Sequence, residues 1–276
     1  MNEGIRSTNV WLWLTIPIVS LLAMASGGGL LISGLYRDAP YFVAQAVGQD
    51  PVSVTVVLPL LIISAILTSR GSVRAKVIWL GGLTYLVYTY AVAAFEVRFN
   101  SLFLVYVALL GCSLYALIGG MVTTNMAEIK ACFTEKTPAK AISIYLAVLA
   151  VLFYFLWLSE VVPALVAGGI LKSIQDNGTP TNAVHVLDMA WVLPAFLITS
   201  VSLWRKRGLG YTLAGVLLSY CVLLTLAILS MAVFMIQGGH PVAAPQLGIF
   251  GALFVISLGM MIWYMKGLKS PGTLKR

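Results

Sequence analysis

Eight long apolar runs constrain the fold of this chain more than any other feature. They extend over Val10 to Ile32, Val52 to Thr68, Val77 to Phe95, Ser101 to Thr123, Ala141 to Ser159, Val184 to Trp204, Tyr211 to Ile236 and Leu247 to Met265. A membrane-spanning helix needs about 20 mainly apolar residues, and within the hydrocarbon its backbone must satisfy its own hydrogen bonds. The runs therefore predict an all-α polytopic bundle of about eight transmembrane helices, a single integral membrane domain over residues 1–276.

Composition supports this class of protein. Hydrophobic residues make up 60% of the 276 residues and charged residues only 9%, whereas about a quarter of the residues in a soluble domain are charged. The three cysteines are far apart and form no C-x-x-C pair; they are Cys112, Cys132 and Cys221. We interpret them as small buried residues, because neither a disulfide framework nor a metal cluster has such spacing.

The N-terminal segment resembles a secretory signal peptide. Arg6 precedes an apolar run that contains Ala23-Met24-Ala25, a typical cleavage pattern. The run nevertheless continues through three glycines to Ile32. We therefore expect an uncleaved first span.

Basic residues are concentrated in alternate connections. If the N-terminus is cytoplasmic, the inner side holds fourteen Lys and Arg: Arg6, Arg70, Arg74, Lys76, Lys130, Lys136, Lys140, Arg205, Lys206, Arg207, Lys266, Lys269, Lys275 and Arg276. The outer side holds three, Arg37, Arg98 and Lys172. The positive-inside rule then places both termini in the cytoplasm and predicts a multi-pass protein of the cell (cytoplasmic) membrane. This topology also explains the net charge of +8, so no nucleic-acid partner is expected.

Acidic residues are instead concentrated at the outer ends of the spans. Glu96 follows the third span, Glu160 the fifth, and Asp188 lies about one turn inside the sixth. Insertion does not require this distribution, because acids contribute little to topology. Helical spacing extends each into a stripe: Tyr85, Thr89, Val92 and Glu96; Tyr154, Trp157 and Glu160; and Thr181, His185, Asp188, Val192, Ala195, Thr199 and Ser202. Convergence of the stripes would make a cavity open to the outer side.

The sixth span carries the most informative residues. His185 and Asp188 are three apart, so they share one helix face. An ionised Asp at the centre of a membrane helix costs roughly 2.5 to 3.5 kcal/mol, and we expect a partner for it among His185, Arg98 and Arg37. The candidate ligand or proton site comprises His185, Asp188, Glu96, Arg98, Asn100, Glu160, Tyr88 and Trp157, and the cavity would also be lined by Tyr85, Thr89 and Tyr154.

Other interpretations of these residues remain open. Asp188 could be an interfacial cap or form a structural ion pair with Arg98, and His185 and Asp188 could form a proton couple. The chain has only two histidines, His185 and His240, and no H-x-x-x-H spacing, so we predict no metal site. No motif indicates a cofactor.

The connections and helix-weakening residues add further expectations. The connection 33–51 is long enough for a short interfacial helix over Tyr41 to Gly48, whereas Glu96 to Asn100 predicts a tight turn. Thr181 or Asn182 could cap the sixth helix. Kinks are expected at Pro59 and Pro194, and the Gly pairs at 27–29 and 119–120 indicate close helix packing. No internal repeat is convincing enough to indicate an inverted-repeat transporter.

Several short motifs resemble a known group of sequences. They are Gly48-Gln49-Asp50, Arg70-Gly71-Ser72, Tyr88-x-Tyr90 through Phe99-Asn100-x-Leu102-Phe103, and Pro180-Thr181-Asn182 with His185-Val-Leu-Asp188. They resemble stretches in bacterial multi-spanning, eight-helix integral membrane proteins of unassigned activity. The resemblance implies the membrane architecture and carries no function.

Three functional hypotheses follow from the sequence. The first is a protein in the lipid bilayer that binds and translocates or senses a small molecule or ion at the outer site. The second is an intramembrane enzyme acting on a lipid or quinone-like substrate, with His185 as general base oriented by Asp188. The third is an accessory subunit that docks a membrane-protein partner, and a homo-oligomer is also possible.

Overall fold

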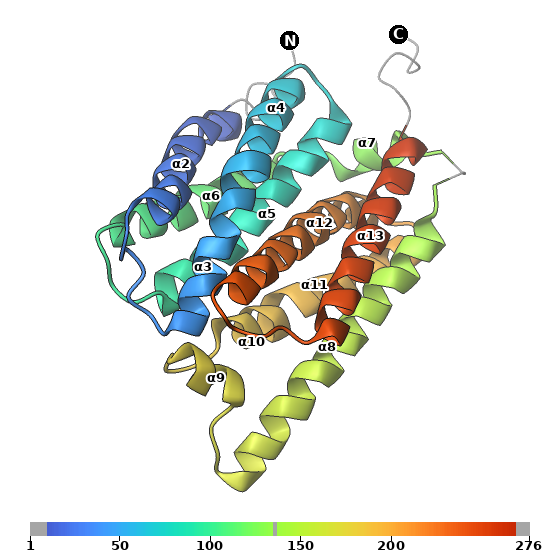
Figure 1. Ribbon diagram of the computed structural model, residues 1–276. Coiled ribbons are helices and arrows are strands. Elements are labelled where there is room, and N and C mark those ends of the chain that lie inside the picture. Colours follow the sequence, from blue (N-terminus) through green and yellow to red (C-terminus); the bar gives the residue numbers. More distant parts are fainter. Residues whose placement is uncertain (1–9, 135–136, 269–276) are drawn as a thin grey trace.

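The computed structural model describes residues 10–134 and 137–268, and within these ranges the fold is all-helical apart from an isolated bridge between Phe133 and Leu268 (Figure 1). The helices are α2 (Thr15–Leu31), α3 (Pro40–Val52), α4 (Leu58–Ser69), α5 (Val73–Glu96), α6 (Phe103–Val122), α7 (Met126–Ala131), α8 (Ala139–Ala167), α9 (Lys172–Asn177), α10 (Ala183–Leu187), α11 (Leu193–Trp204), α12 (Gly208–Gln237) and α13 (Ala244–Gly267). Two five-residue π-helical turns, Ser53–Val57 and Asp188–Val192, join α3 to α4 and α10 to α11.

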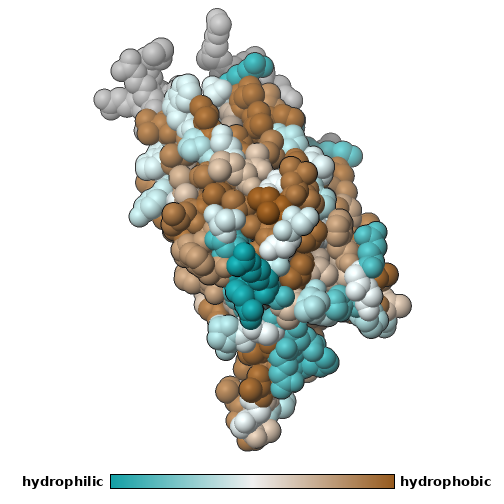
Figure 2. All heavy atoms as spheres, turned by 60° about the vertical axis from the view of Figure 1, so that its left-hand side comes forward, coloured by the Kyte–Doolittle hydropathy of each residue, from teal (hydrophilic) through white to brown (hydrophobic). Residues whose placement is uncertain are grey.

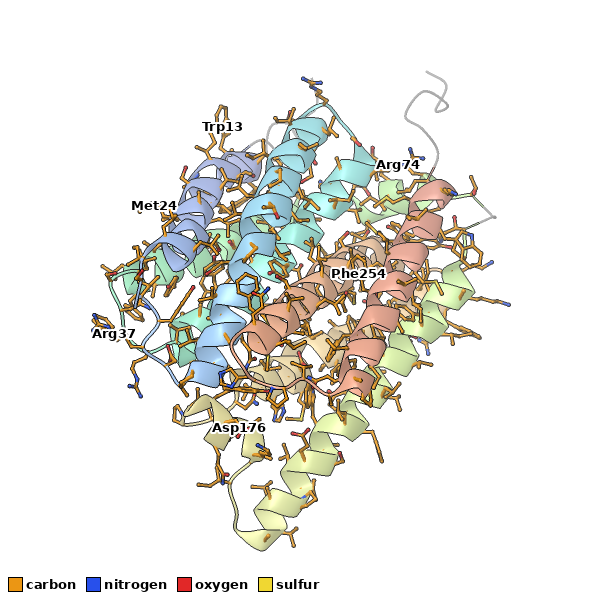
Figure 3. The ribbon with its side chains drawn as sticks, in the orientation of Figure 1. Trp13, Met24, Arg37, Arg74, Asp176 and Phe254 are labelled. Carbon is orange, nitrogen blue, oxygen red and sulfur yellow. The ribbon has the colours of Figure 1, made fainter. Side chains whose placement is uncertain are left out.

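Eight stretches of the described chain are helices long and apolar enough to cross a membrane. They are Val10–Leu31, Pro40–Ser69, Val73–Glu96, Phe103–Val122, Ala139–Ala167, Ala183–Trp204, Gly208–Gln237 and Ala244–Gly267. Large apolar side chains such as Trp13 and Met24 point away from the bundle, and apolar side chains cover much of the visible surface (Figures 2 and 3). The predicted all-α polytopic membrane bundle is confirmed.

The bundle has two chemically different ends. The connections rich in Arg and Lys gather at the end where the first span begins and the last span ends, which we call the basic end; Arg74 lies there (Figure 3). Arg37 and Asp176 lie at the opposite end. Five basic residues used to predict topology lie outside the described residues: Arg6, Lys136, Lys269, Lys275 and Arg276.

Helices α5 and α12 are the two central helices and pack directly on each other. Their contact depends on Gly81, where an added Cβ would lie 2.3 Å from Ser219 Cβ. Trp79 is fully buried and donates a hydrogen bond from Nε1 to Thr15 Oγ1 of α2 at 3.0 Å. The expected packing role of the Gly pairs is confirmed at Gly28, which faces Leu102, and at Gly119, which faces the Trp11 ring.

The second span differs from its prediction. Tyr41 to Gly48 is not a separate interfacial helix, because α3 continues through the first π turn into α4 and the span extends over Pro40–Ser69. Tertiary packing holds α3 in the bundle: Ser230 of α12 donates to the Gly48 carbonyl at 2.6 Å, and a Cβ at Gly48 would lie 2.6 Å from Met231 Cα. The interfacial helix was predicted from the polarity of nearby residues, which contains no information about these contacts with α12.

Both prolines expected to kink helices follow a π turn. Pro59 comes two residues after Ser53–Val57, and Pro194 comes two residues after Asp188–Val192. Proline cannot donate a backbone hydrogen bond and its ring crowds the preceding turn. A π turn, with its i→i+5 pattern, accommodates one extra residue and so absorbs the disturbance.

The bundle consists of two similar halves, residues 10–122 and 139–267, a feature not expected from the sequence. The π turns, Pro59 and Pro194, Arg70 and Arg205, and Tyr85 and Tyr220 all recur at a spacing of 135 residues. Packing recurs too: α4 packs on α5 as α11 packs on α12, and α5 packs on α6 as α12 packs on α13. Each half starts at the basic end, so this is a parallel repeat and not an inverted one.

Candidate functional site

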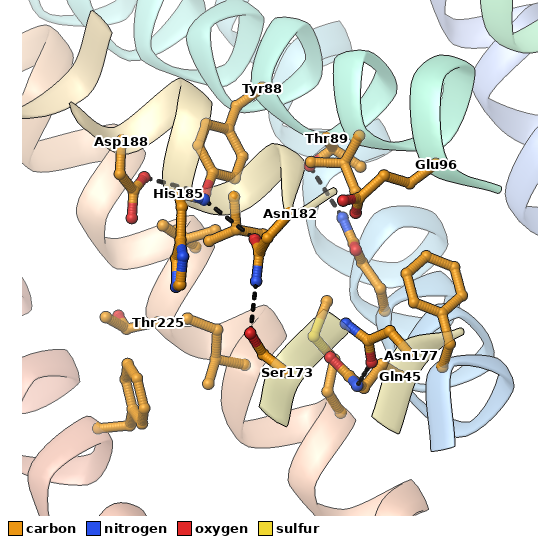
Figure 4. A pocket seen from close by; sticks show the side chains of 18 of the residues that line it. Gln45, Tyr88, Thr89, Glu96, Ser173, Asn177, Asn182, His185, Asp188 and Thr225 are labelled. Carbon is orange, nitrogen blue, oxygen red and sulfur yellow. Dashed lines mark hydrogen bonds between the residues drawn. The ribbon is translucent and has the colours of Figure 1, made fainter. Parts of the chain in front are cut away.

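A cavity of about 870 Å³ lies toward the end opposite the basic end, between the two halves (Figure 4). Helices α3, α5, α8, α9, α10, α12 and α13 contribute to its walls. Six of the eight predicted site residues line it: Tyr88, Glu96, Trp157, Glu160, His185 and Asp188. The faces of the third, fifth and sixth spans therefore converge.

Asp188 is buried and held by neutral donors from two other spans. Tyr88 of α5 donates from Oη to Asp188 Oδ1 at 3.0 Å, and Trp157 of α8 donates from Nε1 to Oδ2 at 2.9 Å. No ion pair to Asp188 exists among the described residues, so the expected charged partner, His185, Arg98 or Arg37, is wrong. Because Asp188 begins the second π turn, its carboxylate is fixed at the point where the helix repeat changes.

His185 lies one turn from Asp188 but makes no hydrogen bond to it in the described structure. The Asn182 side chain caps α10 by accepting from the His185 backbone N–H at 3.0 Å, which confirms Asn182 as the cap. The imidazole lies 4.4 Å from the Trp157 ring, centroid to centroid, with Nε2 3.9 Å from Glu160 Oε2. Nδ1 is buried and has no partner among the described residues, so it can accept from or donate to a ligand.

Two further carboxylates reach the cavity from neighbouring helices. Glu96, at the end of α5, accepts a hydrogen bond from the Ala183 backbone N–H at the start of α10. A carboxylate is favourable there because the helix N-terminus carries partial positive charge. Glu160 has 45% of its side chain exposed and is the more accessible acid.

The charge of the cavity lining is strongly one-sided. Its carboxylates are Asp50, Glu96, Glu160, Asp176 and Asp188. Lys172 is the one Lys or Arg among the lining residues, and it pairs with Asp176 at 2.6 Å. Among the described residues, the lining therefore contains more acidic than basic side chains, and Lys172 neutralises only Asp176.

The side of the cavity between α8 and α13 is apolar and loosely packed. No residue of α8 is buried from Val151 to Ala167, and none of α13 is buried from Ala244 to Ile256. Nearer the basic end, Tyr145 and Ser257 join the two helices by a hydrogen bond of 2.6 Å. The apolar side chains of this wall are Leu149, Phe153, Ala164, Leu247, Phe250 and Leu253.

Two predicted site residues lie outside the cavity. The Arg98 backbone N–H donates to Asp38 Oδ1 at 2.8 Å. Asn100 accepts from the Leu102 backbone N–H at 2.9 Å. Both therefore organise the turn between α5 and α6 instead of lining the cavity rim.

Two aromatic residues predicted to line the cavity, Tyr85 and Tyr154, are not among its lining residues and make other contacts. Tyr85 turns toward α3, where Gln49 donates to its hydroxyl at 3.1 Å and to Thr89, a lining residue, at 2.8 Å. Tyr154 donates to the Met189 carbonyl in the second π turn at 2.8 Å. In the sixth span, Val192, Thr199 and Ser202 of the predicted stripe are buried. Ala195 is only half-buried, and the neighbouring Phe196 lines the cavity instead.

Asp50 and Tyr36 line the cavity but were absent from the predicted site. The predicted boundary at Val52 assigned both to an outer connection. The motif Gly48-Gln49-Asp50 was the available signal, since Gly48 permits the close approach of α12 that draws Asp50 into the bundle.

Within the described residues, no three His, Cys, Asp or Glu side chains are grouped so that they could hold a metal ion. Comparisons of the chain with protein-family models, with curated proteins and with solved structures found no match.

Proposed function

We propose that this membrane protein binds an amphipathic small molecule with a positive charge, an organic cation, in the cavity and translocates or senses it from the outer side. The observation that carries the proposal is the acidity of the described lining: apart from Asp50, and with Asp176 paired to Lys172, the acids Glu96, Glu160 and Asp188 have no Lys or Arg partner there. In a medium of low dielectric constant, unneutralised carboxylates attract a cation more strongly than they do in water.

The shape and walls of the cavity suit such a ligand. Its volume of about 870 Å³ lies within the roughly 300 to 1,000 Å³ typical of small-molecule sites. Phe153 and Phe250 offer apolar surface to the body of the ligand, while Glu160 and Asp188 offer charge. The Trp157 and Tyr88 rings beside Asp188 can add cation–π attraction of about 0.5 to 2 kcal/mol.

The test is equilibrium binding of tetraphenylphosphonium, a permanently charged apolar cation, to the purified protein. We expect Asp188→Asn and Glu160→Gln each to weaken binding at least about tenfold, which corresponds to about 1.4 kcal/mol. Glu128→Gln is the matched control, because it removes one negative charge from α7 at the basic end. Size-exclusion profiles and melting temperatures establish that each variant is folded.

The Glu160→Gln variant keeps the test decisive even if Asp188→Asn fails to fold. Its side chain is 45% exposed, so Glu160→Gln should fold even if the buried Asp188→Asn does not. A wild-type protein that fails to bind the cation, or variants that bind it as tightly as the control, would refute the proposal.

The other two hypotheses have less support. An enzyme with His185 oriented by Asp188 needs a contact between these side chains, and the described structure has no hydrogen bond between them. The accessory-subunit hypothesis draws on the exposed apolar outer parts of α8 and α13. A partner that copurifies in stoichiometric amount would favour it over ligand binding.

A further inference from the structure

The first half contains a second buried carboxylate at the position that corresponds to the candidate site of the second half. Asp50 precedes the first π turn by three residues, as His185 precedes the second. Asp50 is only 6% exposed and lines the same cavity as Asp188. Each half therefore places a polar side chain, Asp50 or His185, three residues before the π turn of its second span.

Hydroxyl groups surround Asp50. Tyr36 donates from Oη to Asp50 Oδ2 at 3.0 Å, and Ser26 of α2 lies beside the carboxylate and within 3.2 Å of Tyr90 Oη. Burial, together with the nearby Asp50 charge, raises the pKa of Tyr36, so this hydroxyl keeps its proton. Tyr106 Oη is buried nearby, next to Tyr36 and Asn100, and makes no geometrically defined hydrogen bond among the described residues.

The packing leaves little space at Asp50. An added Cβ at Gly29 would lie 1.9 Å from Asp50 Oδ2 and 2.7 Å from Tyr36 Oη, so the backbone of α2 presses directly on this group. A neutral carboxyl group is the least costly occupant of such a place in a membrane protein. Tight packing with hydroxyl donors suits a proton better than a larger cation.

No basic side chain faces Asp50 from the elements packed around it. Among the described residues, the titratable groups that interact with Asp50 are the hydroxyls of Tyr36, Tyr85, Tyr90 and Tyr106. Helix α5 also carries Tyr88 and Glu96, which contact Asp188 and the Ala183 backbone, and Arg74 and Lys76, which donate to backbone carbonyls at the basic end. The remaining groups on the neighbouring segments are Asp38, Tyr41, Lys172, Asp176, Tyr220 and Cys221. Lys172 is paired with Asp176, and Tyr220 and Cys221 lie close to Asp188 instead. The side chain of Arg37 points away from the bundle (Figure 3).

We propose that Asp50 is a proton-binding site of the first half, and that the cavity couples it to the cation site of the second half. When a cation enters the cavity, its charge favours release of the proton from Asp50, because a positive charge in the shared low-dielectric space stabilises the negative carboxylate relative to the neutral carboxyl group. The proton leaves to water and the negative carboxylate remains. The proton site stands on the surroundings of Asp50, whereas its coupling to a ligand rests on the proposed function.

Infrared difference spectroscopy between acid and alkaline pH tests the proton site without any ligand. We expect a band from a protonated buried carboxyl group in the wild-type protein, its loss in Asp50→Asn and its retention in the control Glu128→Gln. Tyr36→Phe removes a donor to the charged form and should move the titration of this band to higher pH. A wild-type protein without the band, or Asp50→Asn with an unchanged spectrum, would overturn the proposal.

A conservative variant covers the case in which Asp50→Asn does not fold. Asp50→Glu keeps an acid at the position but moves it by one methylene, so the band should persist with a changed titration midpoint. An unchanged midpoint and band position in Asp50→Glu would assign the signal to another acid and overturn the proposal.

Proton release on addition of tetraphenylphosphonium, followed with a pH indicator in weak buffer, tests the coupling. The wild-type protein should release close to one proton for each cation bound, and Asp50→Asn should bind the cation without releasing a proton. Cation binding with equal release from both proteins would overturn the coupling. If the cation does not bind at all, the proposed function fails, while the infrared result still decides the proton site.

Discussion

The two halves of the bundle share their helix order but differ in how their outer helices close. In the first half, α2 lies tightly on α6, with the Trp11 ring against Gly119 and Leu102 against Gly28. In the second half, the corresponding α8 and α13 have no buried residue over Val151 to Ala167 and Ala244 to Ile256. The same four-span unit is therefore closed in one half and open in the other.

The difference places the two carboxylates in different surroundings. Asp50 lies in the closed half among hydroxyl groups and against the backbone of α2. Asp188 lies next to the open wall, with Glu160 partly exposed beside it. The repeated fold, closed in one half and open in the other, thus gives one cavity a tightly packed buried carboxylate and a second carboxylate beside a more accessible wall.

The largest expected loss of stability comes from a substitution at the contact between the two halves. Gly81→Leu would push a side chain into Ser219 and the Val216 backbone, at places where even a Cβ would lie 2.3 and 2.8 Å away. We expect loss of monodisperse folded protein by size-exclusion chromatography, since overpacking by several atoms exceeds the roughly 1 to 3 kcal/mol typical of smaller insertions. Gly111→Leu is the matched control, because open space surrounds Gly111. Similar yields of both variants would show that the halves do not meet at α5 and α12.

A pair of alanine substitutions tests the closed and open arrangements directly. Gly119→Ala should lower the free energy of unfolding by about 1 to 3 kcal/mol, because the new Cβ would meet the Trp11 ring. Gly251→Ala in α13 has open space around it and should be neutral or stabilise the helix by up to about 1 kcal/mol. Chemical unfolding in micelles measures both. Equal destabilisation would contradict the difference between the halves.

The smallest expected effect comes from the hydrogen bond between α8 and α13, the one polar contact between these helices among the described residues. Tyr145→Phe removes the 2.6 Å hydrogen bond to Ser257 and should lower the free energy of unfolding by about 1 kcal/mol. Tyr115→Phe, at an exposed position of α6 in the first half, controls for loss of a hydroxyl group. If Tyr145→Phe melts at the same temperature as this control, the hydrogen bond contributes nothing to stability and other contacts hold α8 and α13 together at this point.

Much of the architecture follows from the sequence because membrane spans depend on local composition. The eight apolar runs, the turn after Glu96 and the Asn182 cap need only nearby residues, and the structure agrees with them. The extension of the second span to Pro40 depends on contacts with α12, nearly 200 residues away in the chain, such as Ser230 to Gly48. No local pattern around residue 40 contains that information.

Only the part of the candidate site that depends on local helical spacing was predicted. This spacing predicted that Glu96, Glu160 and Asp188 would share one cavity, and all three line it. It could not identify Tyr88 and Trp157 as the hydrogen-bond donors to Asp188, because these contacts join residues 100 and 31 positions apart. The parallel repeat was missed because the matching positions, such as Pro59 with Pro194 and Tyr85 with Tyr220, are widely separated single residues.

The most direct measurement of the central difference is an experimental structure in lipid nanodiscs, prepared without added ligand or chelator. We expect α8 and α13 to stand apart beyond Tyr145 and Ser257, with non-protein density between them that reaches Asp188 and His185. The contrary result is a second half in which α8 packs along the whole of α13, as α2 packs on α6, and Asp188 is sealed from any ligand.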